Sequence, residues 1–259
     1  MDTALAAALD AVRAAGDLAL RHFTGTVQVT LKPDQTPVTE ADREAEQAIV
    51  GRLRAAFPDI GFLGEEFGAN GPQERRWIID PIDGTKNFVR GIPYWATLLA
   101  LEEAGEVTLG VVHAPATGDL LWARRGQGAF ANDRPLRVST IDRLAEATVL
   151  HSSLKDFGPE GYRAALLRLV DRSERTRAFG DYFGYTFVLR GQAEVMLEAD
   201  VKPWDLAPLK VLFEEAGGRF TDFEGRPTIY SGTALASNGR LHAEALAVLN
   251  GSERRRDGC

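Results

Sequence analysis

Residues 77 to 85 read Trp-Ile-Ile-Asp-Pro-Ile-Asp-Gly-Thr, an apolar run followed at once by two carboxylates three positions apart. The run Trp77–Ile79 predicts a short buried strand, which would deliver Asp80 to the strand's end. Asp83 can then point into the same space as Asp80, with the carbonyl of Ile82 between them. Oxygen ligands of this kind are those that a hard cation such as Mg²⁺ takes.

Pro81 and Gly84 shape this segment and also allow a plainer interpretation. Pro fixes φ, Gly permits a backbone conformation that other residues resist, and both, like Asp, are common in turns. Taken alone, the segment therefore fits an ordinary turn as well as a ligand site. Three further acidic segments lie at the edges of expected strands or helices: Pro37–Asp42, Gly64-Glu65-Glu66 and Trp204-Asp205. Four independent turns explain this pattern poorly, so it favours one shared site.

The composition is that of a globular protein. The chain has 259 residues, 44% hydrophobic and 26% charged, and can bury a substantial core. Its formal net charge of -7 argues against broad nucleic-acid binding and against attraction to anionic membranes. The single cysteine, Cys259, forms no internal disulfide, and neither a membrane span nor a signal sequence is visible. We therefore expect a cytoplasmic protein without nucleic-acid or membrane partners.

Apolar periodicity predicts two helices and a largely antiparallel sheet in the first part of the chain. One helix is expected at residues 4–22, and a second runs from Thr39, its expected N-cap, to Pro58. The expected strands cover residues 26–31, 60–63, 76–80, 95–103, 106–114, 119–124, 128–130 and 135–138.

From residue 147 the pattern alternates between strand and helix, which predicts a second sheet with helices on its faces. Strands are expected at 148–151, 193–198, 219–221 and 235–237, and helices at 159–170, 181–190, 205–216 and 240–249. The expected organisation is one compact structural unit with two halves and a tail. Its parts are an N-terminal α+β half (1–146), a C-terminal α/β half (147–250) and a polar tail (251–259).

Four motifs in a fixed order resemble those of a known family. They are Val38-Thr39-Glu40-Ala41-Asp42, Gly64-Glu65-Glu66, Asp80-Pro81-Ile82-Asp83-Gly84-Thr85-Lys86-Asn87-Phe88, and Trp204-Asp205 followed by Glu215-Ala216-Gly217-Gly218. From about Leu5 to about Leu249 the chain is similar to the inositol monophosphatase-like, Mg²⁺-dependent phosphatases. The resemblance implies an α/β (α+β) fold, an αβαβα layered sandwich of the sugar-phosphatase type. It also implies a homodimer that hydrolyses a small phosphorylated substrate.

The resemblance implies two or three Mg²⁺ ions, held by the acidic residues of these motifs. A first ion would take Glu65, Asp80 and the Ile82 carbonyl as ligands. A second would take Asp83 and Asp205 and share Asp80. The composition agrees with this role, because a chain of negative net charge needs bound metal to attract a phosphate ester.

Other roles follow from the same resemblance. Thr85 and Asp42 would form the water-activating pair, with Glu65 completing the catalytic set. The N–H groups of Gly84 and Thr85, at the expected start of a helix, would contact the phosphate. Plain helix capping is the alternative interpretation of Asp42 and Asp205, since Asp is common at helix starts.

The substrate's alcohol part would be recognised by Asp181 and Glu198, unless Asp181 simply caps its helix. Two anions suit a cationic leaving group better than a neutral polyol. The segments Arg177–Tyr185 and Val201–Asp205 also resemble the histidinol-phosphatase branch of the family. The expected reaction is hydrolysis of L-histidinol phosphate to L-histidinol and phosphate, in histidine biosynthesis. The complete expected substrate site comprises Asp83, Gly84, Thr85, Asp181, Glu198 and Asp205.

Two other functions stay open on the sequence. An inositol-1-monophosphatase, or a phosphatase of broad sugar-phosphate specificity, would use the same metal ligands. A non-catalytic binding protein built on the same fold is the interpretation from another class. Broken metal motifs or a basic patch would mark such a protein, and the sequence has neither.

Overall fold

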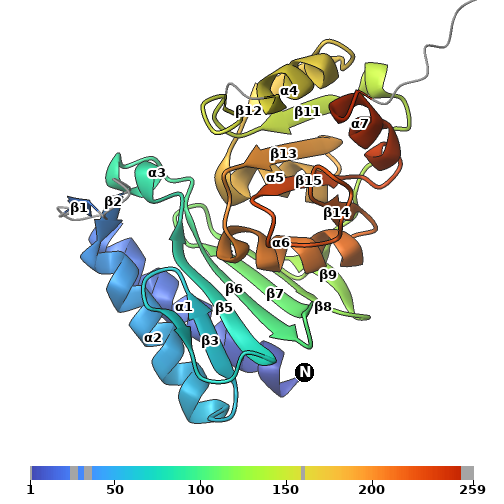
Figure 1. Ribbon diagram of the computed structural model, residues 1–259. Helices are drawn as coiled ribbons and strands as arrows, with labels where there is room; N and C mark the ends of the chain where they lie inside the picture. The colour runs from blue at the N-terminus through green and yellow to red at the C-terminus, as the bar shows by residue number, and fades with distance from the viewer. Residues whose placement is uncertain (1, 24–28, 32–36, 159–160, 252–259) are drawn as a thin grey trace, which may run out of the picture. The chain divides into compact units, whose positions relative to one another are not determined.

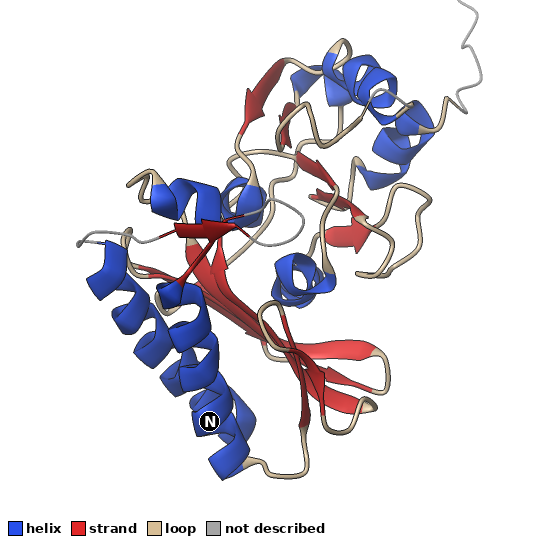
Figure 2. Cartoon of the chain, turned by 60° about the vertical axis from the view of Figure 1, so that its left-hand side comes forward, coloured by secondary structure: helices blue, strands red, loops and turns tan. Residues whose placement is uncertain are grey.

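The computed structural model describes residues 2–23, 29–31, 37–158 and 161–251 (Figures 1 and 2). These residues form two compact units. The first unit contains Met1–Leu136 together with Pro203–Glu215, and the second contains Arg137–Lys202 together with Ala216–Cys259. The two units differ in their bounds from the halves expected at 1–146 and 147–250, chiefly because one late helix packs with the early part of the chain.

The first unit is built on an eight-stranded sheet with the order β10-β9-β8-β7-β6-β5-β3-β4. Its strands are β3 (Gly61–Gly64), β4 (Gly68–Asn70), β5 (Arg75–Asp83), β6 (Ala96–Glu103), β7 (Glu106–Ala114), β8 (Asp119–Arg124), β9 (Gly128–Ala131) and β10 (Arg134–Pro135). Neighbours pair antiparallel except for β3 and β5, which are parallel. A separate antiparallel pair joins β1 (Val29–Leu31) to β2 (Pro37–Thr39). The largely antiparallel sheet predicted from the sequence is confirmed.

Helices cover both faces of this sheet. Helices α1 (Thr3–Phe23) and α2 (Glu40–Ala56) lie side by side on one face, and α6 (Pro203–Glu215) lies on the other (Figure 1). Successive side chains of a strand therefore point alternately to the two covered faces. Trp77 and Ile79 of β5 belong to the core under α1 and α2, whereas the intervening Ile78 points to the opposite face. A short helix, α3 (Thr85–Val89), follows β5.

The second unit has a five-stranded sheet with the order β12-β11-β13-β15-β14. Its elements are η1 (Leu144–Glu146), β11 (Thr148–His151), α4 (Tyr162–Val170), β12 (Arg175–Ala178), α5 (Asp181–Leu189), β13 (Val195–Ala199), β14 (Arg219–Thr221), β15 (Thr233–Ser237) and α7 (His242–Leu249). Helices α4 and α7 pack on one face of this sheet, where they share a core with residues such as Val195 and Leu197. Helix α5 packs on the other face, where Gly184 meets Met196. The alternation of strand and helix is therefore confirmed.

Several expected elements have different bounds. The strand expected at 135–138 ends at Pro135, which has no N–H to continue the ladder. Residues 24–28, 32–36 and 159–160 lie outside the described residues, so the expected strand at 26–31 is seen only as β1. The strands β4 and β12 were not predicted, because their side chains are largely exposed and show no apolar alternation.

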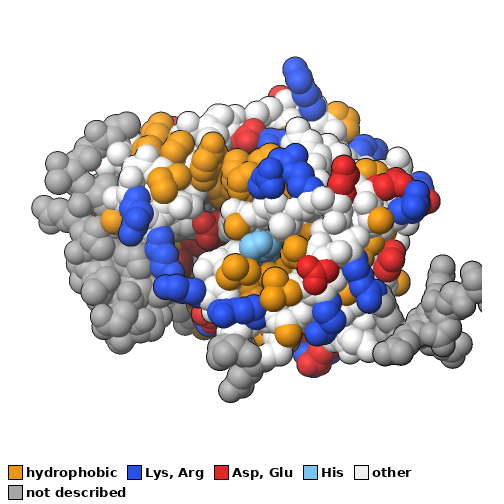
Figure 3. Space-filling view, turned by 90° about the horizontal axis from the view of Figure 1, so that it is seen from above, with side chains coloured by type: hydrophobic (Ala, Val, Ile, Leu, Met, Phe, Trp, Pro, Cys, Tyr) orange, Lys and Arg blue, Asp and Glu red, His pale blue; other side chains and the backbone are white. Residues whose placement is uncertain are grey.

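The surface of each unit carries scattered apolar side chains. The large exposed ones are Phe67, Ile92, Tyr94, Leu154, Tyr162, Leu167 and Tyr230. On the face drawn in Figure 3, apolar side chains are interspersed with basic and acidic ones. Among the described residues, no helix combines the length and the apolar character that crossing a membrane requires.

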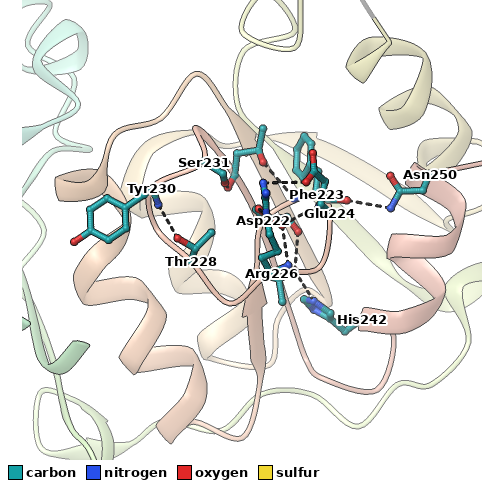
Figure 4. Close-up of polar contacts among 11 residues, drawn as sticks. Asp222, Phe223, Glu224, Arg226, Thr228, Tyr230, Ser231, His242 and Asn250 are labelled. Atoms are coloured by element: carbon teal, nitrogen blue, oxygen red, sulfur yellow. Dashed lines mark hydrogen bonds and ion pairs between the residues drawn. The ribbon is translucent and has the colours of Figure 1, made fainter. Parts of the chain in front are cut away.

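A network of hydrogen bonds between buried polar groups lies beside α7 in the second unit (Figure 4). Asp222 is fully buried and accepts the N–H groups of Glu224 and Arg226, at 2.9 and 2.8 Å. His242, also fully buried, places Nδ1 2.8 Å from the Ser237 hydroxyl and Nε2 2.9 Å from the Thr221 hydroxyl. The Thr221 hydroxyl donates to the Asp222 carbonyl, so the neutral imidazole donates from Nε2 and is satisfied at both nitrogens.

Two helix glycines give a matched pair of variants. A Cβ at Gly51 in α2 would meet nothing within 4 Å, whereas one at Gly16 in α1 would lie 2.4 Å from His113 Nδ1. We expect Gly51→Ala to stabilise the protein by about 0.5–1 kcal/mol through helix propensity. Gly16→Ala should destabilise it by about 1–3 kcal/mol, since the methyl group displaces His113 from the Val12 carbonyl. Urea denaturation measures both, and equal effects would contradict the close packing of α1 on β7.

The buried histidine predicts how stability varies with pH. Burial lowers the pKa of His242 from 6.5 to about 4. The unfolded chain therefore binds a proton at higher pH than the folded one. Stability from the neutral imidazole is complete above about pH 6.5 and is lost as the pH falls towards about 4. The whole loss is about 3 kcal/mol. His242→Gln should flatten this dependence in urea denaturation at several pH values. His22→Gln, at a partly exposed position, should leave the dependence in place.

Candidate metal centre

A β-bulge brings Asp80 and Asp83 to the same side of β5. Residues three apart in a regular strand point to opposite faces. Here Asp80 pairs with Leu98 and Asp83 pairs with Ala96, so two residues of β5 oppose Thr97 alone. The Thr97 hydroxyl donates to the Pro81 carbonyl at 2.9 Å and holds the bulge in place. The strand expected to end at Asp80 therefore continues to Asp83, and the segment is a bulge, not a turn.

A third carboxylate comes from α6, on the same unit. Asp205 is the third residue of this helix and is half-buried, while Asp80 and Asp83 are 2% and 6% exposed. One carboxylate oxygen from each of the three residues lies within 4.8 Å of those of the others. The alternative that Asp205 is only an N-cap does not fit, because α6 begins two residues earlier, at Pro203.

Glu65 and the Ile82 carbonyl extend this group. The parallel strands β3 and β5 end together, and the Glu65 N–H donates to the Ile79 carbonyl at 3.1 Å. The Glu65 side chain lies close enough to Asp80 for its charge to raise the pKa of that carboxyl. The Ile82 N–H donates to Asp80 Oδ1 at 3.0 Å, and the Ile82 carbonyl accepts the Thr85 hydroxyl at 3.0 Å. A carbonyl has two lone pairs, so one remains for another ligand.

The electrostatics of this group fit a cation. Burial raises the pKa of Asp80 well above its ordinary value, and the charges of Glu65, Asp83 and Asp205 raise it further. Such repulsion is relieved by a divalent ion, for which carboxylate and carbonyl oxygens are suitable ligands. The residues present therefore fit the metal that the sequence motifs imply.

Asp42 and Thr85 lie next to each other at the starts of two helices. Asp42, the third residue of α2, is buried and accepts the Thr39 N–H at 2.7 Å, so it does cap its helix. Burial raises its pKa to about 6, against the lowering effect of the Thr39 hydrogen bonds. The Thr85 hydroxyl is 3.5 Å from Asp42 Oδ1. Its single proton can thus go either to Asp42 or to the closer Ile82 carbonyl.

Gly84 connects the bulge to α3 and needs to be glycine. It is the N-cap of α3, and its φ of 81° lies in the left-handed region, where a Cβ is strained. Its carbonyl accepts the N–H groups of Asn87 and Phe88, at 2.8 and 3.0 Å. The first N–H groups of a helix have no partner within it, and those of Thr85 and Lys86 are in this position.

Asp181 and Glu198, the two expected specificity residues, are together in the second unit. The Asp181 N–H donates to Glu198 Oε1 at 3.1 Å, and Glu198 is 6% exposed. Asp181 has a φ of 56°, a conformation that Asp adopts more readily than most residues. Gly180, not Asp181, is the N-cap of α5.

One buried carboxylate was missed at the sequence level. Glu46 in α2 is 1% exposed, and its two oxygens accept the N–H groups of Glu66 and Phe67. Burial raises its pKa to about 7. Its position one helical turn after Asp42 was the only available signal, because residues four apart share a helix face.

Comparison with known proteins agrees with this fold. A relative from Streptomyces coelicolor named histidinol-phosphatase is 46% identical over 233 residues, which are 86% of this chain and 88% of that protein. The extragenic suppressor protein SuhB of Bartonella henselae has a similar structure, with a TM-score of 0.89, 32% identity and complete coverage of both chains. An IMPase of Thermotoga maritima gives a TM-score of 0.87 at 38% identity, covering 97% of this chain and 98% of that one. The family model described as the inositol monophosphatase family matches residues 1–254, and the chain belongs to this family.

Proposed function

We propose that the protein is a Mg²⁺-dependent phosphate monoester hydrolase. The observation that carries this proposal is the convergence of Asp80, Asp83 and Asp205, with carboxylate oxygens within 4.8 Å of one another. Membership of the inositol monophosphatase family supports it. A phosphate monoester is hydrolysed extremely slowly in water, and divalent ions are an effective way to lower the barrier.

Mg²⁺ is the proposed ion because every donor in the group is an oxygen. Glu65, Asp80 and the Ile82 carbonyl would hold one ion, and Asp83 and Asp205 would share Asp80 for another. A third Mg²⁺ ion would bring the total to three, the larger of the two numbers that the family resemblance implies. Bound ions would supply an activated water and screen the charge on the phosphoryl and leaving oxygens.

The chain's own residues would bind the ester and move a proton. The N–H groups at Gly84 and Thr85 would receive phosphate oxygens at the start of α3. The Thr85 hydroxyl would accept a proton from the attacking water while donating its own to Asp42. For this step the hydroxyl turns from the Ile82 carbonyl towards Asp42, which is already 3.5 Å away.

L-Histidinol phosphate is the proposed substrate, and the Streptomyces relative named histidinol-phosphatase supports this choice. Histidinol carries an ammonium group, and Asp181 and Glu198 would place two carboxylates beside it. Their hydrogen bond within the second unit supports a joint role. The alternative is an inositol-1-monophosphatase or a broad sugar-phosphate phosphatase, which the similarity to the Thermotoga IMPase supports.

The rest of the proposal concerns the protein's surroundings. We propose a cytoplasmic homodimer that acts on a small phosphorylated substrate and binds neither nucleic acid nor membranes. The net charge of -7 supports the last part, because it disfavours polyanionic partners. The resemblance in the four motifs supports the dimer.

Asp83→Asn tests the metal centre. When Mg²⁺ is added to wild-type protein from which EDTA has removed the metal, Tm should rise. At a Mg²⁺ concentration of 100 times the dissociation constant, the free energy of unfolding should increase by about 2.7 kcal/mol. The variant should lose this increase and its phosphatase activity. Without metal it should melt above wild type, because the repulsion of Asp80 is relieved, on the order of 1 kcal/mol. Asp142→Asn removes the same charge at an exposed site and should behave as wild type. Wild-type protein whose Tm ignores Mg²⁺ would contradict the proposal.

A substrate panel tests specificity. We expect kcat/KM to be higher for L-histidinol phosphate than for inositol 1-phosphate. Asp181→Asn removes the charge and tolerates the positive φ, so kcat/KM for histidinol phosphate should fall about tenfold, equivalent to one lost charged contact. The value for inositol 1-phosphate should hardly change. Asp200→Asn is the matched control, since Asp200 is exposed and has a φ of 59°. A wild-type preference for inositol 1-phosphate would identify the alternative function. Mg²⁺ binding without phosphate release from any ester would indicate a binding protein.

A further inference from the structure

Glu46 joins α2 to the turn that carries Glu65. Its Oε2 accepts the Glu66 N–H at 2.8 Å, and its Oε1 accepts the Phe67 N–H at 3.2 Å. Strands β3 and β4 pair from Gly64 to Gly68, so residues 65–67 form the turn of a hairpin. The carboxylate of Glu46 therefore binds two of the three N–H groups of this turn.

Gly64, the residue before Glu65, lies directly against the same carboxylate. A Cβ at this position would lie 1.8 Å from Glu46 Oε1. The φ of Gly64 is not positive, so the backbone conformation itself is open to other residues. The requirement for glycine is one of space, and the space is taken by the Glu46 carboxylate. Both chain neighbours of Glu65 are thus fixed by one side chain.

The outer side of this hairpin is open to solvent, whereas on its inner side the Glu65 N–H donates to the Ile79 carbonyl. All three residues of β4 are exposed, and Phe67 is 51% exposed. Among the described residues, no core packing therefore holds the outer side of the hairpin. Within the described part of the chain, Glu46 forms no ion pair with a basic side chain either. A carboxylate that is 1% exposed and lacks a cation is unfavourable unless hydrogen bonds compensate it, and here the turn's N–H groups offset part of that cost.

We propose that Glu46 is a positioning residue, which fixes the hairpin turn at residues 65–67 and so holds the Glu65 carboxylate ready for metal. The inference rests on the proposed metal centre, because Glu65 matters here as a ligand. It adds to that centre a residue that touches neither metal nor substrate. Glu46 acts by limiting the directions in which Glu65 can point before the ion arrives.

Glu46→Gln is the direct test. The amide keeps the size of the side chain but turns one oxygen into an NH₂ group, which would face a backbone N–H donor. In metal-free protein, the Glu66 and Phe67 amides should exchange with solvent about tenfold faster, in proportion to the lost protection. By isothermal titration, the Mg²⁺ dissociation constant should rise about 10-fold or more. Gly64→Ala should raise the constant by the same route, and the double variant should raise it by less than the product of the two effects.

Glu194→Gln is the matched control. Glu194 is 3% exposed and accepts the Thr148 N–H at 2.7 Å, but it belongs to the second unit. The substitution should lower Tm, because it weakens a buried hydrogen bond, while the Mg²⁺ dissociation constant stays at the wild-type value. If Glu46→Gln does not fold, Glu46→Asp keeps the charge on a shorter side chain and serves for the same two measurements.

The outcomes separate the two proposals. Wild type that binds no Mg²⁺ contradicts the metal centre and this inference with it. Wild type that binds Mg²⁺, with loss in Asp83→Asn, supports the centre. If Glu46→Gln then keeps the wild-type constant and exchange rates, the positioning role is wrong and the centre stands. An equal rise of the constant in Glu194→Gln would also overturn the positioning role, because general loss of stability would then explain the effect.

Discussion

Repulsion between carboxylates that the fold forces together is the constraint on which the first unit depends. Asp80, Asp83 and Asp205 come from a strand and a helix distant in sequence, and each would be hydrated and apart in the unfolded chain. Folding removes most of that water and raises the pKa of Asp80. The apolar core on both sides of the sheet has to supply the free energy for this arrangement. When a cation binds, the same carboxylates become its ligands, and their repulsion no longer opposes folding.

The strand and the helix that carry these carboxylates keep them close together despite their mutual repulsion. Asp80 and Asp83 are separated by a bulge within a sheet that is covered on both faces, and Asp205 lies in the first turn of a helix packed on that sheet. Sites built on strands and helices keep their geometry better than sites built on loops. Glu65 is the exception, because it lies in the turn of an edge hairpin whose outer strand is exposed. The contacts made by Glu46 lie at this weak point.

Much of this arrangement can be read from the sequence, and the limits have physical causes. The helix at residues 4–22 was predicted to within a residue of α1, because its apolar periodicity is strong. The strands expected at 95–103 and 106–114 agree with β6 and β7 to within a residue, and Ala104 and Gly105 between them have positive φ. The bulge was missed because it is defined by pairing with β6, which no local pattern encodes. Glu46 was missed because a charged residue in a helix normally faces solvent, and its partners belong to a turn twenty residues away.

Helix α6 has a consequence for how such a protein can be divided. By its packing it belongs with residues 1–136, but the chain reaches it only after residues 137–202 have been made. A gene fragment ending at Leu136 would encode the whole large sheet and leave one of its faces bare. It would also lack the carboxylate of Asp205. The first unit is therefore not a continuous segment that recombination could transfer to another protein. During synthesis on the ribosome, the large sheet waits for its covering helix until about four-fifths of the polypeptide has emerged.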